Sequence, residues 1–363
     1  MPNPAKLRSA LAIAATCAAL ALTIPFPAMA QDAVPPADAQ TKAIVAAADA
    51  FLATLDAAQK TSAMFEFSNA TQRTNWTNFP QGGPGANRVG VKWGDMTDAQ
   101  HAAFTTFLGT ILSPKGATMA LEQVAADDIV AANDAKEAAG KASNGRPPVS
   151  FGSAFYWISF LGTPSTTTPW MLQFGGHHLA INATVVGPNV TLSPSLTGGQ
   201  PQKFDYNGKP IYIVEQEATE AAAFLASLTV DQRGKAILSP ELADLVLGPG
   251  KDGMTLQPEG IAGADLTDVQ KTAFLALIAA RLGMINADDL AAAMADVKAN
   301  LDQTTFGWWG PTDPVGAAYF RITAPTAIIE FSPQTQDGDP TDHAHNMYRN
   351  PANEYGAAWA KLQ

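Results

Sequence analysis

The sequence predicts an α+β protein in which helices pack on a largely antiparallel sheet. Segments with apolar residues at helical spacing alternate along the chain with pairs of strand-like runs. The turns inside each pair are short enough for hairpins, which join antiparallel strands. Because repeats of about 20–50 residues are absent, a solenoid is not expected.

The first thirty residues have the pattern of a signal peptide. Lys6 and Arg8 precede an apolar run from Leu11 to Ile24, and the small-residue triplet 28–30 follows as a cleavage site. Retention of this segment as an amino-terminal anchor is the alternative. Residues 31–40 are polar and contain proline, which predicts a disordered lead, and residues 41–363 are expected to form a single domain.

Charge and cysteine content exclude several classes of function. The formal net charge is −11, and removal of the signal peptide with Lys6 and Arg8 makes it −13, which disfavours nucleic acid as a partner. No membrane span is expected after signal removal, since no later stretch approaches about 18 apolar residues. Cys17, the only cysteine, lies in the signal peptide, so the mature chain has no disulfide, cysteine zinc site or thiol nucleophile. These features favour a periplasmic or extracellular protein.

The first predicted element is an amphipathic helix over residues 41–60, with Ile44, Ala48, Phe51 and Leu55 on one face. Residues 64–67 fit either a short strand or the end of that helix. An aromatic, glycine-rich loop follows over residues 73–85. Its Trp76 and Phe79 either cover the core or line a site.

Three helices are predicted to begin with a capping box, in which a threonine N-cap and a glutamine three residues later satisfy each other's backbone N–H groups. The pairs are Thr97 with Gln100, Thr229 with Gln232, and Thr267 with Gln270.

The first and third capping boxes begin a longer correspondence. Each is followed by a second helix (about 118–139 and 286–301), an aromatic glycine segment, and a pair of strands (170–174 with 179–185, and 318–323 with 327–331). We interpret this as a divergent duplication with pseudo-repeats at 95–190 and 264–350. Between them, residues 210–214 are a candidate strand and residues 217–228 an amphipathic helix.

Four of the five histidines form two short motifs. His177 and His178 follow Gly175-Gly176, where we expect the glycines to make a tight turn. In an extended segment adjacent side chains point to opposite sides, so only one of this pair is expected to join a common site. His343 and His345 are two apart and would project from the same face of a strand.

Three imidazoles with an open fourth position suit catalytic zinc, and imidazole ligation also suits copper. A metal-free polar pocket and structural histidines are the alternatives, because the chain has no His-Glu-x-x-His motif to strengthen the metal hypothesis. His101, on a helix face, is expected to be structural.

Three charged residues are candidates for chemistry beside these histidines. Glu330 interrupts an apolar strand, so it either faces solvent or is buried opposite Arg321, Arg349 or a metal. Arg321 and Arg349 could hold an anionic substrate or form ordinary salt bridges. A Walker loop, a dinucleotide fingerprint and a Gly-x-Ser-x-Gly elbow are all absent from the sequence.

Several of these motifs together resemble the DUF3500 family over nearly all of the mature chain. The specific parts are the Gly-His-His-Leu run at 176–179 and the His-x-His…Tyr-Arg-x-Pro run at 343–351, with further likeness at 73–80, 319–322 and 329–334. The sequence departs from the family pattern at Asn350, where an acidic residue is expected, and at 353–355, where Asn-Asp-Tyr is expected. The resemblance implies no activity.

The sequence favours an exported metal-dependent enzyme in which His177 or His178, with His343 and His345, binds Zn or Cu. Glu330 would orient the site or act as a general base, and Arg321 or Arg349 would hold a small-molecule substrate. Hydrolysis is the first expectation and oxygen-dependent redox chemistry the second. The alternatives are a secreted small-molecule or metal-binding module without turnover, and a structural envelope protein. Whether the protein is an enzyme, and its reaction, substrate and oligomeric state, are left open.

Overall fold

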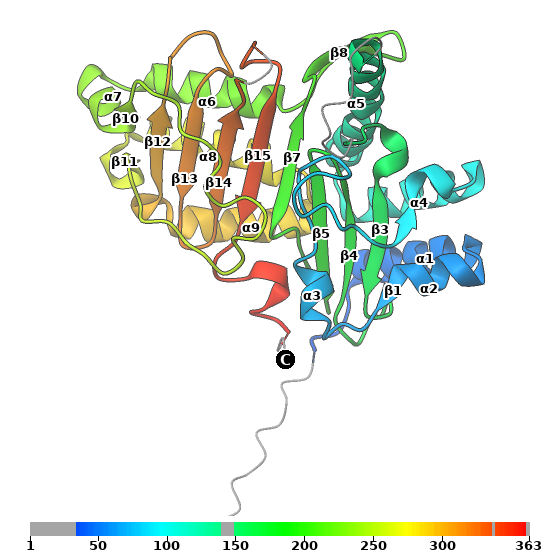
Figure 1. Cartoon of the computed structure of the whole chain (residues 1–363). Coiled ribbons are helices and arrows are strands. Elements are labelled where there is room, and N and C mark those ends of the chain that lie inside the picture. The colour runs from blue at the N-terminus through cyan, green and yellow to red at the C-terminus, as the bar shows by residue number, and fades with distance from the viewer. Residues whose placement is uncertain (1–33, 139–148, 336–337, 361–363) are drawn as a thin grey trace, which may run out of the picture. The chain divides into compact units, whose positions relative to one another are not determined.

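The computed structural model describes residues 34–138, 149–335 and 338–360 (Figure 1). The predicted signal peptide lies outside these residues, as does the start of the predicted lead. Residue Asp38 is already the N-cap of the first helix, and its side chain accepts a hydrogen bond from the Thr41 N–H. Ordered structure therefore begins slightly earlier than expected.

A single large sheet dominates the structure, and it is largely antiparallel, as predicted. Only two pairs of described strands run parallel, β1 with β3 and β10 with β12. The main strand order is β1-β3-β4-β5-β7-β15-β14-β13-β12-β10, with β2, β6 and β11 paired at its margins and β8–β9 forming a separate hairpin. The strands are β1 (Met64–Phe65), β2 (Val91–Lys92), β3 (Trp157–Leu161), β4 (Trp170–Gly176), β5 (Leu179–Val186), β6 (Asn189–Thr191), β7 (Ser195–Gly199), β8 (Lys203–Tyr206), β9 (Lys209–Tyr212), β10 (Ile237–Ser239), β11 (Ile261–Ala262), β12 (Thr305–Trp309), β13 (Tyr319–Thr323), β14 (Ile328–Pro333) and β15 (Ala344–Arg349).

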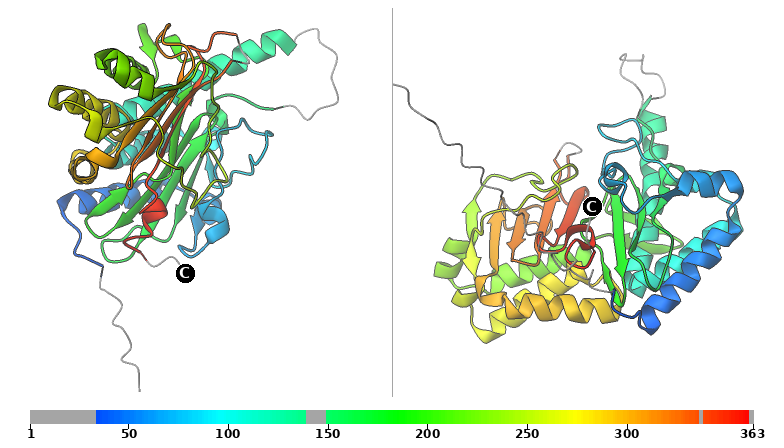
Figure 2. Two further views of the ribbon diagram at one scale, coloured as in Figure 1. Left: turned by 90° about the vertical axis from the view of Figure 1, so that its left-hand side faces the viewer. Right: turned by 90° about the horizontal axis from the view of Figure 1, so that it is seen from below.

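Helices cover one face of this sheet, and irregular segments run over the other. Figures 1 and 2 show α1, α4, α6, α8 and α9 behind the strands, with segments 74–90 and 240–260 in front. The α-helices are α1 (Ala39–Thr54), α2 (Ala57–Ala63), α3 (Ala70–Arg73), α4 (Asp98–Ile111), α5 (Pro114–Ala138), α6 (Glu215–Ser227), α7 (Val230–Ala236), α8 (Asp268–Leu282) and α9 (Ala287–Ala299). Short 3-10 turns are η1 (Trp93–Asp95), η2 (Ser153–Phe155), η3 (Gly263–Asp265), η4 (Leu301–Gln303) and η5 (Glu354–Gly356).

Aromatic clusters fill the space between the helices and the sheet. Phe104 of α4 meets Phe174 of β4 with their ring centroids 4.8 Å apart, and Phe224 of α6 meets Phe306 of β12 at 5.0 Å. Such pairs contribute roughly 0.5–1.5 kcal/mol each beyond the burial of their surface. They fix the helices against the sheet and leave the opposite face to the polar residues of the same strands.

Alternation along the central strands separates the apolar core from the polar face. In β14, Ile329 and Phe331 belong to the main hydrophobic core, whereas Glu330 and Ser332 face the other way, where segment 240–260 runs. Ser332 pairs with His345 across β14 and β15, so His345 shares the polar face. The sheet thus gathers polar groups on the side opposite its helices.

All three predicted capping boxes are present. A fourth box begins at Asp56, whose side chain accepts from the Gln59 N–H while Gln59 bonds back to the Asp56 N–H. The single helix predicted over residues 41–60 is therefore wrong: the chain forms α1 and α2, because Asp56 caps a new helix after Leu55 leaves helical geometry.

The two halves of the sheet have similar edges, in which β1 and β10 pair in parallel with β3 and β12, and β2 and β11 pair with the same strands antiparallel. The internal duplication itself stays a prediction. Among the residues that the structure describes, no helix is long and apolar enough to cross a bilayer.

Candidate metal centre

The histidine pair forms the tight turn between β4 and β5. Gly176 pairs with Leu179, which leaves His177 and His178 as the two turn residues. The expectation that Gly175-Gly176 makes the turn is wrong, because both glycines lie in β4. Gly176 is needed for another reason: a Cβ there would lie 2.6 Å from the Tyr156 ring.

His178 occupies a strained backbone position. Its φ is +57°, in the left-handed region that glycine and asparagine usually take in such turns. An L-residue with a Cβ costs roughly 1–2 kcal/mol there. Strain of this kind persists where the surroundings enforce it, and it is common at functional sites.

His343 lies immediately before β15, and His345 is the second residue of that strand. The register of β5, β7 and β15 places this end of β15 level with the β4–β5 turn. His343 and His178 are 165 positions apart in the chain, yet their Nε2 atoms lie 3.0 Å from each other. The ring centroids of His178 and His345 are 4.9 Å apart. One ligand atom from each of the three imidazoles lies within 4.8 Å of the others. We call His178, His343 and His345 the histidine triad.

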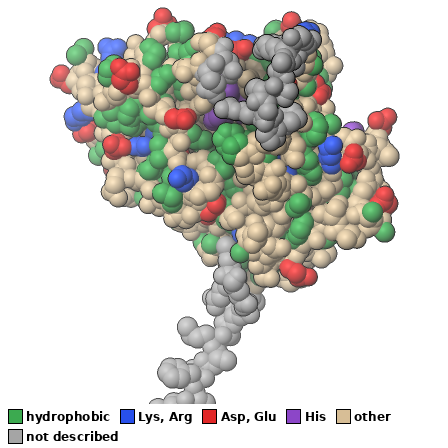
Figure 3. Space-filling view, in the orientation of Figure 1, with side chains coloured by type: hydrophobic (Ala, Val, Ile, Leu, Met, Phe, Trp, Pro, Cys, Tyr) green, Lys and Arg blue, Asp and Glu red, His purple; other side chains and the backbone are tan. Residues whose placement is uncertain are grey.

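The triad is buried, with exposed fractions of 4%, 5% and 9% for His178, His343 and His345. Figure 3 shows a small patch of histidine surface in the upper half of the face it draws. Burial lowers the pKa of His178 well below its usual value, and the neighbouring imidazoles add to this effect. Burial and the nearby His343 lower the pKa of His345 to about 3. Both rings are therefore neutral at pH 7, which is the form that binds metal ions.

Neighbouring amides hold the triad in place. The Asn78 backbone carbonyl accepts a hydrogen bond from the His178 N–H at 3.1 Å, and its side-chain Nδ2 lies 3.1 Å from His345 Nε2. Gln123 of α5 donates to the His178 carbonyl. Asn78 thus connects the β4–β5 turn to β15, through the backbone of His178 and the imidazole of His345.

His177 belongs to a separate polar pair beside the triad. Its Nδ1 lies 2.6 Å from Asp127 Oδ1, and the other Asp127 oxygen accepts from the Gly152 N–H at 2.9 Å. Tyr156 donates its hydroxyl proton to the His177 carbonyl oxygen at 2.6 Å. The His177 ring stacks on His178 with centroids 3.8 Å apart. Only His178 joins the triad, but the expected reason is wrong: the two histidines form a turn and their rings stack, so they do not point to opposite sides of a strand.

Glu330 is fully buried and binds the segment that crosses the polar face. Its two carboxylate oxygens accept the N–H groups of Val246 and Leu247, each at 2.8 Å, and Oε2 also accepts the Tyr319 hydroxyl at 2.6 Å. Arg321 lies directly opposite Glu330 across β13 and β14.

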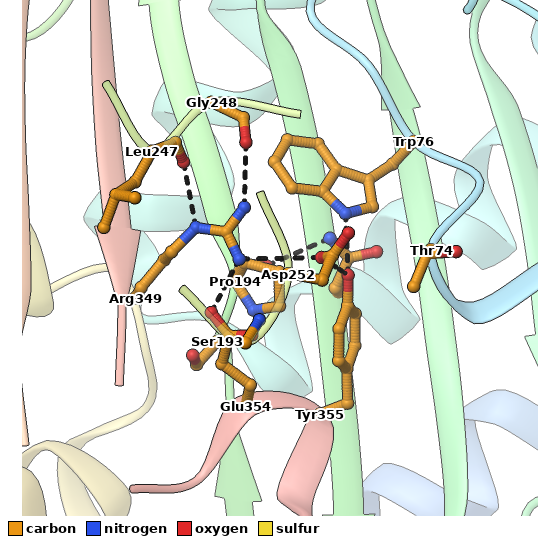
Figure 4. A network of polar contacts seen from close by, with 12 residues as sticks. Thr74, Trp76, Ser193, Pro194, Leu247, Gly248, Asp252, Arg349, Glu354 and Tyr355 are labelled. Atoms are coloured by element: carbon orange, nitrogen blue, oxygen red, sulfur yellow. Dashed lines mark hydrogen bonds and ion pairs between the residues drawn. The ribbon is translucent and has the colours of Figure 1, made fainter. Parts of the chain in front are cut away.

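Arg349 holds the same segment from β15. Its Nε and Nη2 donate to the carbonyl oxygens of Leu247 and Gly248, both at 2.9 Å, and its Nη1 pairs with Glu354 at 2.6 Å (Figure 4). Glu354 is thus the acidic partner of Arg349, and it stands at the middle position of residues 353–355, where Asn-Asp-Tyr was expected. Trp76 donates to the Tyr355 hydroxyl beside this network at 2.9 Å.

The segment held by Glu330 and Arg349 carries Asp244, which hydrogen-bonds to Ser332 at 3.2 Å and to Gln334 at 3.1 Å. Its carboxylate acts electrostatically on His345 and raises the pKa of that ring, against the larger opposing effects of burial and His343. Ser332, which pairs with His345 across the strands, and Gln334 thus hold the Asp244 carboxylate near the triad, while Glu330 and Arg349 hold the backbone that follows it.

Arg321 is held by other partners. Its Nη2 pairs with Glu259, and its guanidinium lies 4.9 Å from the Trp309 ring centroid. His101 packs as expected, stacked on Trp93 with ring centroids 4.4 Å apart.

Sequence reasoning did not identify Asn78, Asp127 or Asp244 as part of this region. Asn78 lies inside the aromatic, glycine-rich loop at residues 73–85, and its position in that loop was the only feature of the sequence that pointed to it. Asp127 and Asp244 lie in a helix and a loop without a motif, and only folding brings them to the histidines.

No curated protein and no solved structure matches this chain. A family model described as a protein of unknown function matches residues 37–357. The chain therefore belongs to the DUF3500 family.

Proposed function

We propose that the protein is an exported metal-dependent enzyme whose histidine triad binds a zinc or copper ion. The observation that carries the proposal is the meeting of three buried imidazoles from segments 165 positions apart. Grouping neutral imidazoles away from water is unfavourable unless a ligand or a hydrogen bond satisfies their nitrogen atoms.

The donor set fits such an ion. Zinc and copper both accept neutral imidazole, and Zn–N distances of about 2.0–2.1 Å place tetrahedral ligand atoms roughly 3.3 Å apart. The 3.0 Å separation of the His178 and His343 nitrogens is close to that value, and the wider limit of 4.8 Å for the whole triad requires a small adjustment. A bound ion would supply Lewis acidity or, for copper, one-electron chemistry.

A cavity beside the triad supports a small-molecule substrate or ligand. It has a volume of about 400 Å³, and His343 forms part of its wall. The wall also includes Phe151, Gln200 and three aspartates, Asp134, Asp339 and Asp342, and no lysine or arginine among the described residues. A neutral or cationic molecule suits this lining better than an anion.

The contacts of Glu330 favour an orienting role over that of a general base, because both carboxylate oxygens bind backbone N–H groups of segment 244–248. Arg349 contributes to the same task through the carbonyl groups of that segment. Substrate binding by Arg321 or Arg349 stays a prediction. Both guanidiniums already pair with a glutamate, Glu259 and Glu354 respectively.

Hydrolysis is the first reaction class that we propose, and oxygen-dependent oxidation the second, since both follow from imidazole ligation. Export to the periplasm or cell exterior is part of the proposal and rests on the sequence of residues 1–30. The similar edges of the two half-sheets support the proposed duplication. A secreted metal- or small-molecule-binding module without turnover is the second candidate function, since three imidazoles can bind an ion without any reaction following.

Metal analysis tests the proposal. Protein purified without a histidine tag, incubated with Zn²⁺ or Cu²⁺ and then desalted, should retain about one ion per chain. The variants His343→Ala and His345→Ala should lose it, whereas His101→Ala, remote from the triad, should retain it. Sub-stoichiometric metal in the wild-type protein after incubation would overturn the proposal.

Cobalt substitution separates the enzyme from the binding module. If a coordination position is open, as a catalytic site requires, azide should change the visible spectrum of the Co²⁺ protein. A spectrum that does not respond to azide would indicate a filled coordination shell and favour the binding module.

A further inference from the structure

The loop that carries Asn78 crosses the polar face of the sheet beside the histidine triad (Figure 1). Its backbone is held there at three successive residues. Arg88 donates from Nη2 to the carbonyl oxygens of Thr77, at 2.8 Å, and Phe79, at 2.6 Å. The carbonyl oxygen of Asn78, between them, accepts the His178 N–H at 3.1 Å. These bonds keep the Asn78 side chain at the triad, and none of them uses that side chain.

The Asn78 amide shares a nitrogen atom with the triad. Its Nδ2 lies 3.1 Å from Nε2 of His345. An amide nitrogen only donates hydrogen bonds, so Nε2 of His345 is the acceptor in this contact and directs its lone pair toward Asn78. A metal ion binds a neutral imidazole through the same lone pair. An ion bound to His345 therefore replaces this hydrogen bond and lies against the Asn78 amide.

The amide oxygen of Asn78 is available to such an ion. The side chain is only 5% exposed, and within the described residues its Oδ1 has no hydrogen-bond partner. The nitrogen and oxygen of an amide are so alike in size that a half-turn about the Cβ–Cγ bond exchanges them with little change in packing. A cation repels the N–H groups and attracts the oxygen, so it favours the turned amide.

The distances fit a fourth ligand. Tetrahedral ligand atoms around zinc lie roughly 3.3 Å apart. The amide atom of Asn78 that faces His345 is 3.1 Å from its Nε2, and Nε2 of His178 is 3.0 Å from Nε2 of His343. Asn78 is thus as close to one member of the triad as the other two members are to each other.

We propose that Asn78 is the fourth ligand of the metal centre, through its amide oxygen Oδ1. The inference rests on the proposed function, because it needs the ion that the triad is proposed to bind. Three imidazoles with one oxygen form a harder donor set than imidazoles alone, so the site would favour Zn²⁺ or Cu²⁺ over Cu⁺. A neutral amide oxygen is a weak ligand, so an incoming molecule could displace it or bind as a fifth ligand.

Two substitutions of Asn78 separate ligation from hydrogen bonding. Asn78→Ala removes both, whereas Asn78→Asp keeps an oxygen in place and loses the donor to His345. The Kd for Zn²⁺, measured by competition with a chromophoric chelator, should rise at least roughly tenfold in Asn78→Ala. In Asn78→Asp it should equal the wild-type value or lie below it. Weaker Zn²⁺ binding by Asn78→Asp would show that Asn78 acts only as a donor to His345, and would overturn the proposal.

Asn75→Ala and Asn75→Asp are the matched controls in the same loop. The Asn75 amide donates to the side chain of Gln72 and to the carbonyl oxygen of Asn87 instead of to a histidine. Both control variants should bind Zn²⁺ as the wild type does. Asn75→Asp also tests whether a negative charge on the loop is enough to strengthen binding, and tighter binding by it equal to that of Asn78→Asp would overturn the proposal.

The visible spectrum of the Co²⁺ protein is the second readout. Because the spectrum depends on the ligands, both Asn78 variants should differ from the wild type, and both Asn75 variants should match it. An unchanged Zn²⁺ affinity or an unchanged Co²⁺ spectrum in folded Asn78→Ala would overturn the inference and leave the proposed function standing. Wild-type protein that binds neither ion would overturn both.

Discussion

Replacement of His178 by glycine and by alanine separates its backbone strain from its role as a ligand. Both variants remove the imidazole, so both lose the same ring contacts. They differ in how the new residue tolerates a φ of +57°. The left-handed conformation destabilises a folded protein with alanine at this position by roughly 1–2 kcal/mol, whereas glycine adopts it without this cost.

The expected difference is smaller than this strain, because glycine has more conformational freedom to lose on folding, roughly 0.5–1 kcal/mol. The balance leaves His178→Gly more stable than His178→Ala by roughly 0.5–1 kcal/mol. Urea unfolding of the metal-free proteins measures this difference. His177 provides the matched control, since its φ is not positive: His177→Gly should be less stable than His177→Ala, with the opposite sign.

Metal binding by the same four proteins supplies the second measurement. Both His178 variants should lose the ion, and both His177 variants should retain it, because His177 pairs with Asp127 outside the triad. A His178→Ala variant as stable as His178→Gly would refute the strained turn. Retention of metal at wild-type affinity by either His178 variant would refute ligation by that residue.

Two further predictions concern acid stability and the segment beside the triad. The folded pKa of His345, about 3, lies below the unfolded value of about 6.5, so between these pH values the unfolded chain binds a proton that the folded chain does not. The free energy of unfolding of the metal-free protein, measured by urea unfolding, should therefore fall by roughly 2 kcal/mol per such residue from pH 7 to pH 5. The variant His345→Gln should show a smaller fall over the same pH range. An unchanged pH dependence in that variant would contradict the lowered pKa of His345. Glu330→Gln should destabilise the protein by roughly 1–3 kcal/mol and speed hydrogen exchange at the Val246 and Leu247 amides, which donate to that carboxylate. Glu217→Gln, which removes another buried carboxylate, should leave exchange at those two amides unchanged, and equal acceleration in both variants would indicate general destabilisation instead.

The sequence was sufficient for features that depend on neighbouring residues. Capping boxes at Thr97, Thr229 and Thr267 were predicted from residues three positions apart, and all three formed. Short turns within the strand pairs predicted a largely antiparallel sheet, and the alternation of side chains along a strand predicted the projection of His343 and His345 from one face. It also explains why Glu330 points away from the apolar core of its strand. These outcomes follow from local geometry, which the chain carries within a few residues.

Other features depended on contacts between distant segments. Whether Gly175-Gly176 or the histidines made the turn was decided by the pairing of β4 with β5 and by the Tyr156 ring, which occupies the space beside Gly176. Glu330 was expected either to face solvent or to be buried opposite an arginine or a metal. It is buried opposite Arg321 in the strand register, but its carboxylate binds the backbone of segment 244–248.

The sequence by itself determined the three helices with threonine capping boxes, the strand pairs within residues 170–185 and 318–331, and the identity of the histidines that could ligate a metal. Only the tertiary structure decided that His178 meets His343 and His345, that His177 turns to Asp127, and that Asp244 is fixed nearby. The physical reason is that local periodicity specifies which face a side chain occupies, whereas the order and register of strands far apart in the chain specify what it faces.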